Sequence, residues 1–176
     1  MKNVGVMLDK NLNLDRHVNL IVSHCYKILK DIGRVKRCMD RTHLERVVHA
    51  VISTRLDYCN SLLMNNSKEN LYKLQKVQNA AAKLILGKKK PDSASQALRE
   101  LHWLNVESRI VFKILLLTFK ILKGQCSNNM TLRYKGFNGR PGDYLLLETP
   151  VFKTAYGKRV FEYNASRLWN ALAVTV

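Results

Sequence analysis

The chain has 176 residues, of which 47% are hydrophobic. It fits one globular domain, or a domain with a C-terminal appendage, and can bury a moderate core. Thirty Lys and Arg residues against thirteen Asp and Glu residues give a formal net charge of +17. This excess favours a polyanionic partner, because a protein that neutralises phosphates releases their condensed counterions. Nucleic acid is favoured over a membrane surface, and the alternative is a solvated cationic face without a specific partner.

The cysteines and apolar runs point away from several other classes of protein. The four cysteines form no C-x-x-C pair and do not combine with the five histidines at zinc-ligand spacing. We therefore expect reduced thiols, no metal and no cofactor. No signal-peptide apolar region opens the chain, and its longest uncharged apolar run, Ile114 to Phe119, is too short to span a bilayer. We expect no membrane partner and an intracellular location, nuclear if the chain is functional.

The first predicted elements are a strand and a helix. The apolar run from Val4 to Leu8 predicts one strand, followed by a turn at Lys10 to Asn13. A lone strand cannot satisfy its own backbone, so we expect its partner to lie elsewhere, as in a truncated chain. Apolar residues at helical spacing from Val18 to Ile32 predict a helix, with Asp15 as its N-cap and Gly33 just past its end.

Two further helices are predicted in the middle of the chain. Thr42 and Glu45 match the T-x-x-E capping box and begin an apolar stripe that runs from Leu44 to Leu63. A third helix, capped by Ser67, carries a stripe from Leu71 to Ile85. We expect these helices to pack into a bundle through their stripes.

A basic break separates these helices from two more. Gly87 closes the third helix and is followed by Lys88, Lys89, Lys90 and Pro91. Ser93 begins a short fourth helix, and Val106 to Lys123 form a fifth. Trp103 is expected to be buried at the corner between the fourth and fifth helices, with its indole N–H bonded to a partner.

The end of the chain loses and then regains periodicity. Residues 125–143 are dense in Asn, Ser and Gly, which predicts a flexible linker. An extended segment is expected from Tyr144 to Phe152, and a last helix, anchored by Trp169, from Lys158 to Ala173. The predicted fold is mainly α: a helical bundle over 1–124 with one short N-terminal strand, then a linker over 125–143 and a loosely attached extended segment plus helix over 144–176.

Four sequence motifs in a fixed order combine rare residues with these helical stripes. They are STRLDYCNSLL (Ser53 to Leu63), LQKVQNAAAKLIL (Leu74 to Leu86), LHWLNVESRIVFKILLLTFKIL (Leu101 to Leu122) and YGKRVFEYNASRLWNAL (Tyr156 to Leu172). Together with the opening KNVGVMLDKNLNLDRHV, they resemble the C-terminal part of non-LTR retrotransposon polyproteins of the jockey and chicken-repeat kind. The resemblance covers residues 2–173 and is weakest between Gly124 and Asp143.

The resemblance implies a stretch that follows the palm of a reverse transcriptase, in the thumb and post-palm region, so the palm would lie upstream. Reverse transcriptases hold two metal ions with paired aspartates, and this sequence contains no adjacent acidic pair. Asp57, in LDYC, comes closest to such an aspartate pair, but it lies on a predicted helix, where we interpret it as structural. We therefore expect no catalytic residues and no enzymatic activity from this chain alone.

Basic residues form two candidate nucleic-acid-binding clusters. On the third helix, Lys73, Lys76 and Lys83 lie away from the apolar stripe, and the basic break extends their side with Lys88, Lys89 and Lys90. Gln75, Gln78 and Asn79 add hydrogen-bond donors suited to phosphate or sugar oxygens. The second cluster, Arg34, Lys36, Arg37 and Arg41, follows the first helix. Each cluster has the alternative interpretation of a solvated face.

Other polar residues are assigned structural roles. Arg55 and Asp57 are two residues apart on a helix and cannot pair with each other, so we expect them to pair with other helices. Arg109 is interpreted in the same way.

The resemblance implies a non-catalytic C-terminal fragment of an RNA-directed DNA polymerase that grips an RNA–DNA template–primer hybrid. Two alternatives remain. One is a stand-alone basic helical protein that binds nucleic acid. The other is a non-functional relic of a decayed element, favoured by Asn105 and Ala173 where the family pattern has prolines.

Overall fold

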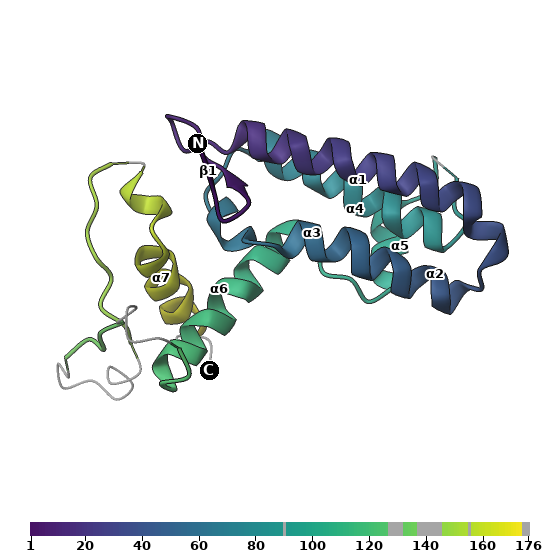
Figure 1. The fold of residues 1–176 in the computed structure, drawn as a ribbon. Coiled ribbons are helices and arrows are strands. Elements are labelled where there is room, and N and C mark those ends of the chain that lie inside the picture. The colour runs from purple at the N-terminus through teal and green to yellow at the C-terminus, as the bar shows by residue number, and fades with distance from the viewer. Residues whose placement is uncertain (90, 127–131, 137–145, 155, 174–176) are drawn as a thin grey trace. The chain divides into compact units, whose positions relative to one another are not determined.

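The structure is a computed structural model that describes residues 1–89, 91–126, 132–136, 146–154 and 156–173. Helices make up most of it, which confirms the mainly α class (Figure 1). The chain separates into two compact units, Met1–Arg109 and Ile110–Val176. Most of the predicted linker over 125–143 lies outside the described residues, so the predicted division of the chain there stays a prediction.

The N-terminus forms a hairpin and not a lone strand. β1 (Lys2–Asn3) pairs antiparallel with β2 (Val6–Met7), and the intervening Val4 and Gly5 have φ values of 44° and 81°. Positive φ at both central residues is the signature of a type I′ hairpin turn. The hydroxyl of Tyr58 donates to the Val4 carbonyl at 2.7 Å and holds this turn. The expected single strand from Val4 to Leu8 is therefore wrong, because the chain turns back at Gly5 and supplies its own partner strand.

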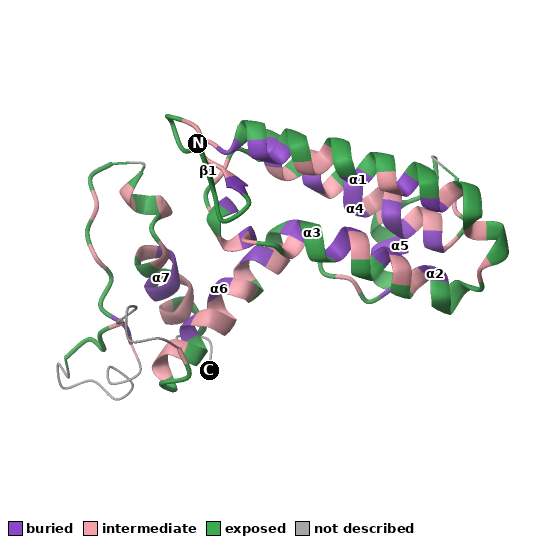
Figure 2. Cartoon of the chain, in the orientation of Figure 1, coloured by how far each residue is buried: buried purple, intermediate pink, exposed green. Residues whose placement is uncertain are grey.

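The first unit is built on two long helices, α1 (Asp15–Val35) and α4 (Lys68–Ile85), which pack along each other (Figure 1). Their contact is apolar: Val18 and Cys25 of α1 and Leu74 and Val77 of α4 are at most 1% exposed. Figure 2 shows that much of the remaining surface of α1 is exposed. The predicted apolar stripes thus form the core of this unit.

Gly33 lies inside α1, so the expectation that it ends this helix is wrong. The helix continues to Val35 and passes into a 3₁₀ turn at Lys36–Cys38. A Cβ at Gly33 would lie 3.8 Å from Cδ1 of Leu84, which shows that α1 closely approaches α4 here. The glycine marks a helix contact and not a helix end.

Asp15 is the first residue of α1 and not its N-cap, a position held by Leu14 with a φ of 60°. The Asp15 carboxylate instead accepts a hydrogen bond of 2.7 Å from the Asn70 side chain, which is buried at the start of α4. Asn70 also donates to the Asn13 carbonyl at 3.3 Å. This shared polar contact fixes the start of α1 on the start of α4.

The stripe from Leu44 to Leu63 is helical without interruption over residues 41–57, and the predicted single helix does not reach Leu63. α2 (Arg41–Val48) leads into a π-helical turn at His49–Ser53, α3 (Thr54–Asp57) follows, and a 3₁₀ turn covers Asn60–Leu63. The break after α3 occurs at Cys59, which has a φ of 52° and cannot continue a right-handed helix.

The N-cap of α2 is Asp40 and not Thr42. The Asp40 Oδ1 accepts from the backbone N–H of His43 at 2.7 Å, and this bond is the main cause that lowers the pKa of the Asp40 carboxyl. A carboxylate two residues earlier in the sequence therefore takes the capping role that the T-x-x-E pattern assigned to the threonine.

The predicted caps of the next two helices are confirmed. Ser67 Oγ accepts from the backbone of Asn70 at 3.2 Å at the start of α4. Ser93 Oγ accepts from Gln96 at 3.4 Å at the start of α5 (Ala94–Glu100). Gly87, with a φ of 64°, follows α4 as expected.

Trp103 is only half-buried, so the expected burial at the corner is wrong. His102 turns the chain with a φ of 53°, and the buried residues around the corner are Leu101 and Val106. The Val106 backbone N–H is bonded to the side chain of Gln75 at 2.8 Å. A glutamine of α4 thus holds the corner, and Trp103 lines a separate open pocket of about 610 Å³ together with Gln75 and Val106.

The second unit contains most of α6 (Val106–Leu122) and all of α7 (Phe161–Ala173). Leu147 is buried and forms an isolated antiparallel bridge with Tyr134. The extended segment expected from Tyr144 is confirmed at this bridge, whereas residues 144 and 145 lie outside the described part. A 3₁₀ turn at Gly157–Arg159 precedes α7.

Candidate nucleic-acid interface

Helix α4 positions the first candidate cluster. Its apolar residues, among them Leu74, Val77 and Ala81, are buried, which turns Lys76 and Lys83 away from the core. The Ser67 cap and the turn at Gly87 fix where the helix begins and ends. The two lysines are seven residues apart and therefore lie two turns apart along one side of the helix.

Four lysines converge on one open hollow of about 720 Å³, which we call the lysine hollow. Lys76 and Lys83 come from α4, Lys88 from the basic break, and Lys36 from the 3₁₀ turn after α1. Other lining residues include Tyr26 and Asn79. No carboxylate lines this hollow among the residues that the structure describes. The two predicted clusters therefore meet, through Lys36, at one concave basic surface.

One acidic residue lies near the edge of this surface. Glu100 accepts from Lys88 Nζ at 2.8 Å and lies 3.5 Å from Arg41. The Lys88 hydrogen bond is the main cause that lowers the pKa of the Glu100 carboxyl, with Arg41 a lesser cause. The local group of three charges keeps a net positive charge, so it orients Lys88 without removing the attraction for an anion.

Lys76 is held over an aromatic ring. Its Nζ lies 4.5 Å from the ring centroid of Tyr72, one turn earlier on α4, in a cation–π contact. This contact restrains the long side chain, which reduces the conformational entropy that Lys76 would lose on meeting a phosphate.

The remaining predicted site residues lie outside the lining of this hollow. Lys73 Nζ pairs with Glu69 at 2.8 Å, and Arg34 pairs with Asp31 at 3.2 Å. Arg37 and Lys89 are exposed, and Lys90 lies outside the described residues. Lys73 and Arg34 are thus partly neutralised by their neighbours on the same helix.

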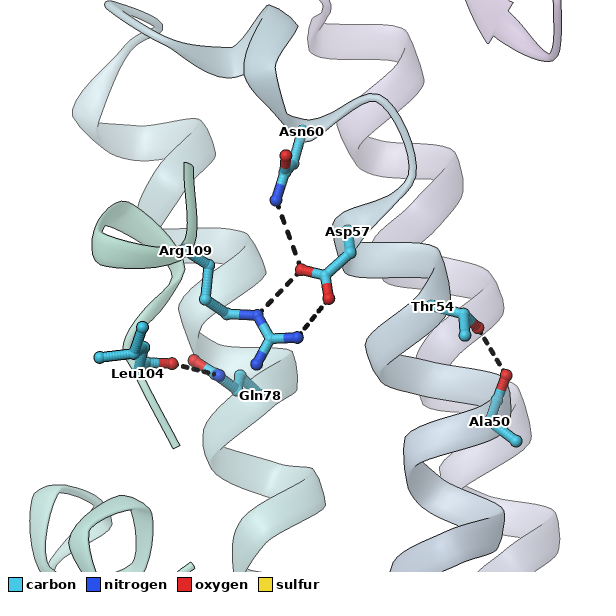
Figure 3. Close-up of polar contacts among 7 residues, drawn as sticks. All are labelled: Ala50, Thr54, Asp57, Asn60, Gln78, Leu104 and Arg109. Atoms are coloured by element: carbon cyan, nitrogen blue, oxygen red, sulfur yellow. Dashed lines mark hydrogen bonds and ion pairs between the residues drawn. The ribbon is translucent and has the colours of Figure 1, made fainter. Parts of the chain in front are cut away.

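Two of the expected amide donors have structural roles. Gln78 is buried, and its Nε2 donates to the Leu104 carbonyl at 2.8 Å (Figure 3). Gln75 donates to Gln78 and Asn79 and accepts from Val106. The expectation that Gln75 and Gln78 face a phosphate is therefore wrong, and of the three amides only Asn79 lines the lysine hollow.

Asp57 forms an ion pair with Arg109, as the assignment of structural roles to both residues predicts. Arg109 Nε donates to Asp57 Oδ1 at 2.9 Å and a second guanidinium nitrogen contacts Oδ2, while Asn60 Nδ2 donates to Oδ1 at 3.3 Å (Figure 3). A carboxylate that accepts three donors from the protein is oriented by its own fold. Nothing in this geometry presents Asp57 to a metal ion.

Tyr26 is a lining residue that sequence reasoning missed. It lies on α1, one turn before Lys30, and it is 42% exposed. An aromatic residue one turn from a lysine on a predicted helix was the available signal, because stacking and cation–π contacts with nucleic acid use such residues.

The described residues contain no group of three or more His, Cys, Asp or Glu side chains that could hold a metal ion. Within the same residues, none of the helices is both long and apolar enough to cross a bilayer. Comparisons with protein-family models, curated proteins and solved structures found no match for this chain.

Proposed function

We propose that this chain is a non-catalytic nucleic-acid-binding part of a non-LTR-type reverse transcriptase, which grips a template–primer hybrid through the lysine hollow. The observation that carries the proposal is the convergence of Lys36, Lys76, Lys83 and Lys88 on one concave surface whose described lining has no carboxylate. The net charge of +17 supports the same partner class. The segment resemblance supports the polymerase context.

Such a surface suits backbone recognition better than base recognition. Lysine ammonium groups bind phosphates as point charges without the planar geometry that reads base edges. Binding of a hybrid at the lysine hollow is therefore sequence-independent and strongly salt-dependent.

The test compares two variants of equal net charge. One changes Lys36, Lys76, Lys83 and Lys88 to Gln; the control changes four exposed lysines elsewhere, Lys10, Lys68, Lys120 and Lys153. Affinity for a short RNA–DNA hybrid is measured by fluorescence anisotropy over a salt series. The hollow variant should lower the salt slope by roughly one unit per lost contact, and the control by much less. Equal affinities and slopes in the two variants would refute the lysine hollow as the interface.

Catalysis is tested by primer extension on an RNA template with Mg²⁺ or Mn²⁺. We expect no nucleotide incorporation by this chain alone, because its sequence has no adjacent acidic pair and Asp57 is bonded to Arg109. Incorporation that exceeds a heat-inactivated control and is lost in Asp57→Asn would contradict the non-catalytic assignment.

A second candidate is a stand-alone nucleic-acid-binding protein. The self-paired hairpin favours it, because β1 supplies the partner that β2 needs and an upstream palm is not required for that role. The two candidates differ in one measurement: a polymerase part should bind an RNA–DNA hybrid more tightly than a DNA duplex of the same length, whereas a general binder should not distinguish them.

A further inference from the structure

A second basic hollow, here called the hairpin hollow, lies between the N-terminal hairpin, α1 and α3. Its volume is about 770 Å³, and its lining includes Lys2, Lys27, Arg55 and Tyr58. Small-ligand pockets typically have volumes of about 300–1,000 Å³, so a nucleotide-sized group fits here. The hairpin hollow shares no lining residue with the lysine hollow.

The charge of the hairpin hollow is entirely positive. Lys2, Lys27 and Arg55 come from three different elements, and none of the described lining residues is acidic. The nearest carboxylate along the chain, Asp57, is held by Arg109 and Asn60 and is not part of the lining. His17 is also in the lining, but burial lowers its pKa, which disfavours its protonated form.

Tyr58 is held at the edge of this hollow with part of its surface open. Its hydroxyl donates to the Val4 carbonyl at 2.7 Å, and its ring lies against the turn, 3.5 Å from where a Cβ at Gly5 would be. Desolvation raises the pKa of this hydroxyl, so it remains a neutral donor at pH 7. Tyr58 is nevertheless 50% exposed, and Leu20, also in the lining, is 51% exposed.

A fixed, half-exposed aromatic ring beside apolar surface and several cations is the arrangement with which proteins bind single strands, since every base has a face that can stack. A duplex keeps its bases stacked inside and cannot offer one to Tyr58. We propose that the hairpin hollow binds a single-stranded segment of nucleic acid, with one unpaired base stacked on Tyr58 and the flanking phosphates contacted by Lys2, Lys27 and Arg55. This inference rests on the proposed nucleic-acid binding and adds a second, base-dependent contact to it.

The experiment uses the full chain and two labelled probes of eight nucleotides, oligo-dT and an abasic strand with the same phosphates. Tyr58→Leu should weaken oligo-dT binding by about 5- to 150-fold, the loss expected for one stacked base. Binding of the abasic strand should change by less than about twofold, because it has no base to stack. Tyr58→Phe keeps the ring, so it should retain most of the difference in affinity between oligo-dT and the abasic strand.

The double variant Lys27→Gln/Arg55→Gln should instead weaken both probes. Its salt slope should fall by roughly 0.7 per lost single-strand phosphate contact. Thermal unfolding of each variant, followed by circular dichroism, verifies that the chain remains folded before binding is measured.

Two results would overturn the inference. If Tyr58→Leu weakens oligo-dT and the abasic strand equally, the ring only holds the hairpin in place. If it changes neither, nucleic acid does not enter the hairpin hollow. Both results are independent of the RNA–DNA hybrid measurement, in which the lysine-hollow variant should lose affinity. If the lysine-hollow variant keeps its affinity for the hybrid, the proposed function is rejected. A base-dependent loss of oligo-dT affinity in Tyr58→Leu can still be observed in that case.

Discussion

The interior of the first unit is mainly apolar, whereas the second unit combines a few apolar residues with polar side chains that bond to the backbone. In the first unit, Val18, Ile52, Leu74 and Val77 are at most 1% exposed. The buried residues described in the second unit are Ile110, Ile114, Leu147 and Ala165, together with Thr118, Asn164 and Ser166.

The polar residues of the second unit are directed at carbonyls and amides of its own chain. Ser166 Oγ donates to the Glu148 carbonyl at 2.9 Å, and Asn164 Nδ2 to the Lys158 carbonyl at 2.9 Å. Asn170 both accepts from the Leu147 N–H at 2.7 Å and donates to the Leu147 carbonyl at 2.9 Å. α7 thus holds an extended segment by hydrogen bonds, whereas apolar side chains form most of the interior of the first unit. The two interiors should therefore respond to different kinds of substitution.

Loss of volume should have its largest effect in the first unit. Leu74→Ala removes a side chain that is 1% exposed at the contact of α4 with α1, so it should lower the free energy of unfolding by about 2–5 kcal/mol. Urea unfolding followed by circular dichroism measures the change. The control is Leu62→Ala, at a residue that is 50% exposed, which should cost no more than about 0.5 kcal/mol. Equal effects of the two substitutions would contradict an apolar, volume-dependent core.

Loss of hydrogen bonds should instead destabilise the second unit. Asn170→Leu keeps a similar volume but leaves the Leu147 N–H and C=O without this partner, which should cost about 1–3 kcal/mol locally. Hydrogen exchange of the Leu147 amide, measured by NMR, should accelerate accordingly. Arg167→Ala, at a neighbouring exposed residue, is the matched control and should leave that exchange unchanged. Unchanged protection in Asn170→Leu would mean that packing alone holds the segment.

His17 is a buried polar exception in the first unit and should make its stability depend on pH. Burial lowers the pKa of His17 from the usual 6.5, so the unfolded chain binds more protons than the folded chain between the lowered pKa and 6.5. The contribution of neutral, buried His17 to the free energy of unfolding is complete above pH 6.5. It is lost as the pH falls from the pKa of His17 in the unfolded chain toward its lower pKa in the folded chain. Unfolding midpoints at pH 7.5 and 5.5 should show less destabilisation on acidification in His17→Gln than in the parent chain; equal pH dependence would rule out this role.

The difference between apolar packing and specific polar contacts also explains what the sequence could predict. Apolar periodicity and the serines at 67 and 93 located α4 and α5, because stripe and cap are local properties of the chain. The polar contacts of Asn70, Asn164 and Asn170 were not predicted, because an asparagine in a helical pattern indicates only a polar position and does not reveal the group with which its side chain bonds.

The candidate site was likewise predictable only in its local features. The sequence placed Lys76 and Lys83 on one side of a helix, and the helical period is enough for that. Their meeting with Lys36 depends on α1 continuing past Gly33, which the glycine concealed. The hairpin hollow was not predicted at all, because it depends on a contact between Tyr58 and Val4, 54 residues apart in the chain.

The smallest expected effect on stability is that of a substitution at Gly33, the glycine that was predicted to end the first helix. Gly33 lies in the interior of α1, and a Cβ there would meet Leu84 at 3.8 Å, an ordinary van der Waals distance. Gly33→Ala should therefore stabilise the first unit by about 0.4–1 kcal/mol, since it restricts the unfolded chain and adds helix propensity without a clash. Gly87→Ala is the matched control: its Cβ would meet nothing within 4 Å, but the φ of 64° strains any residue with a Cβ, so it should destabilise. Both are measured by urea unfolding of the full chain. If Gly33→Ala were as harmful as Gly87→Ala, α1 would end at Gly33 in solution, and Lys36 would lose the helical support that brings it to the lysine hollow.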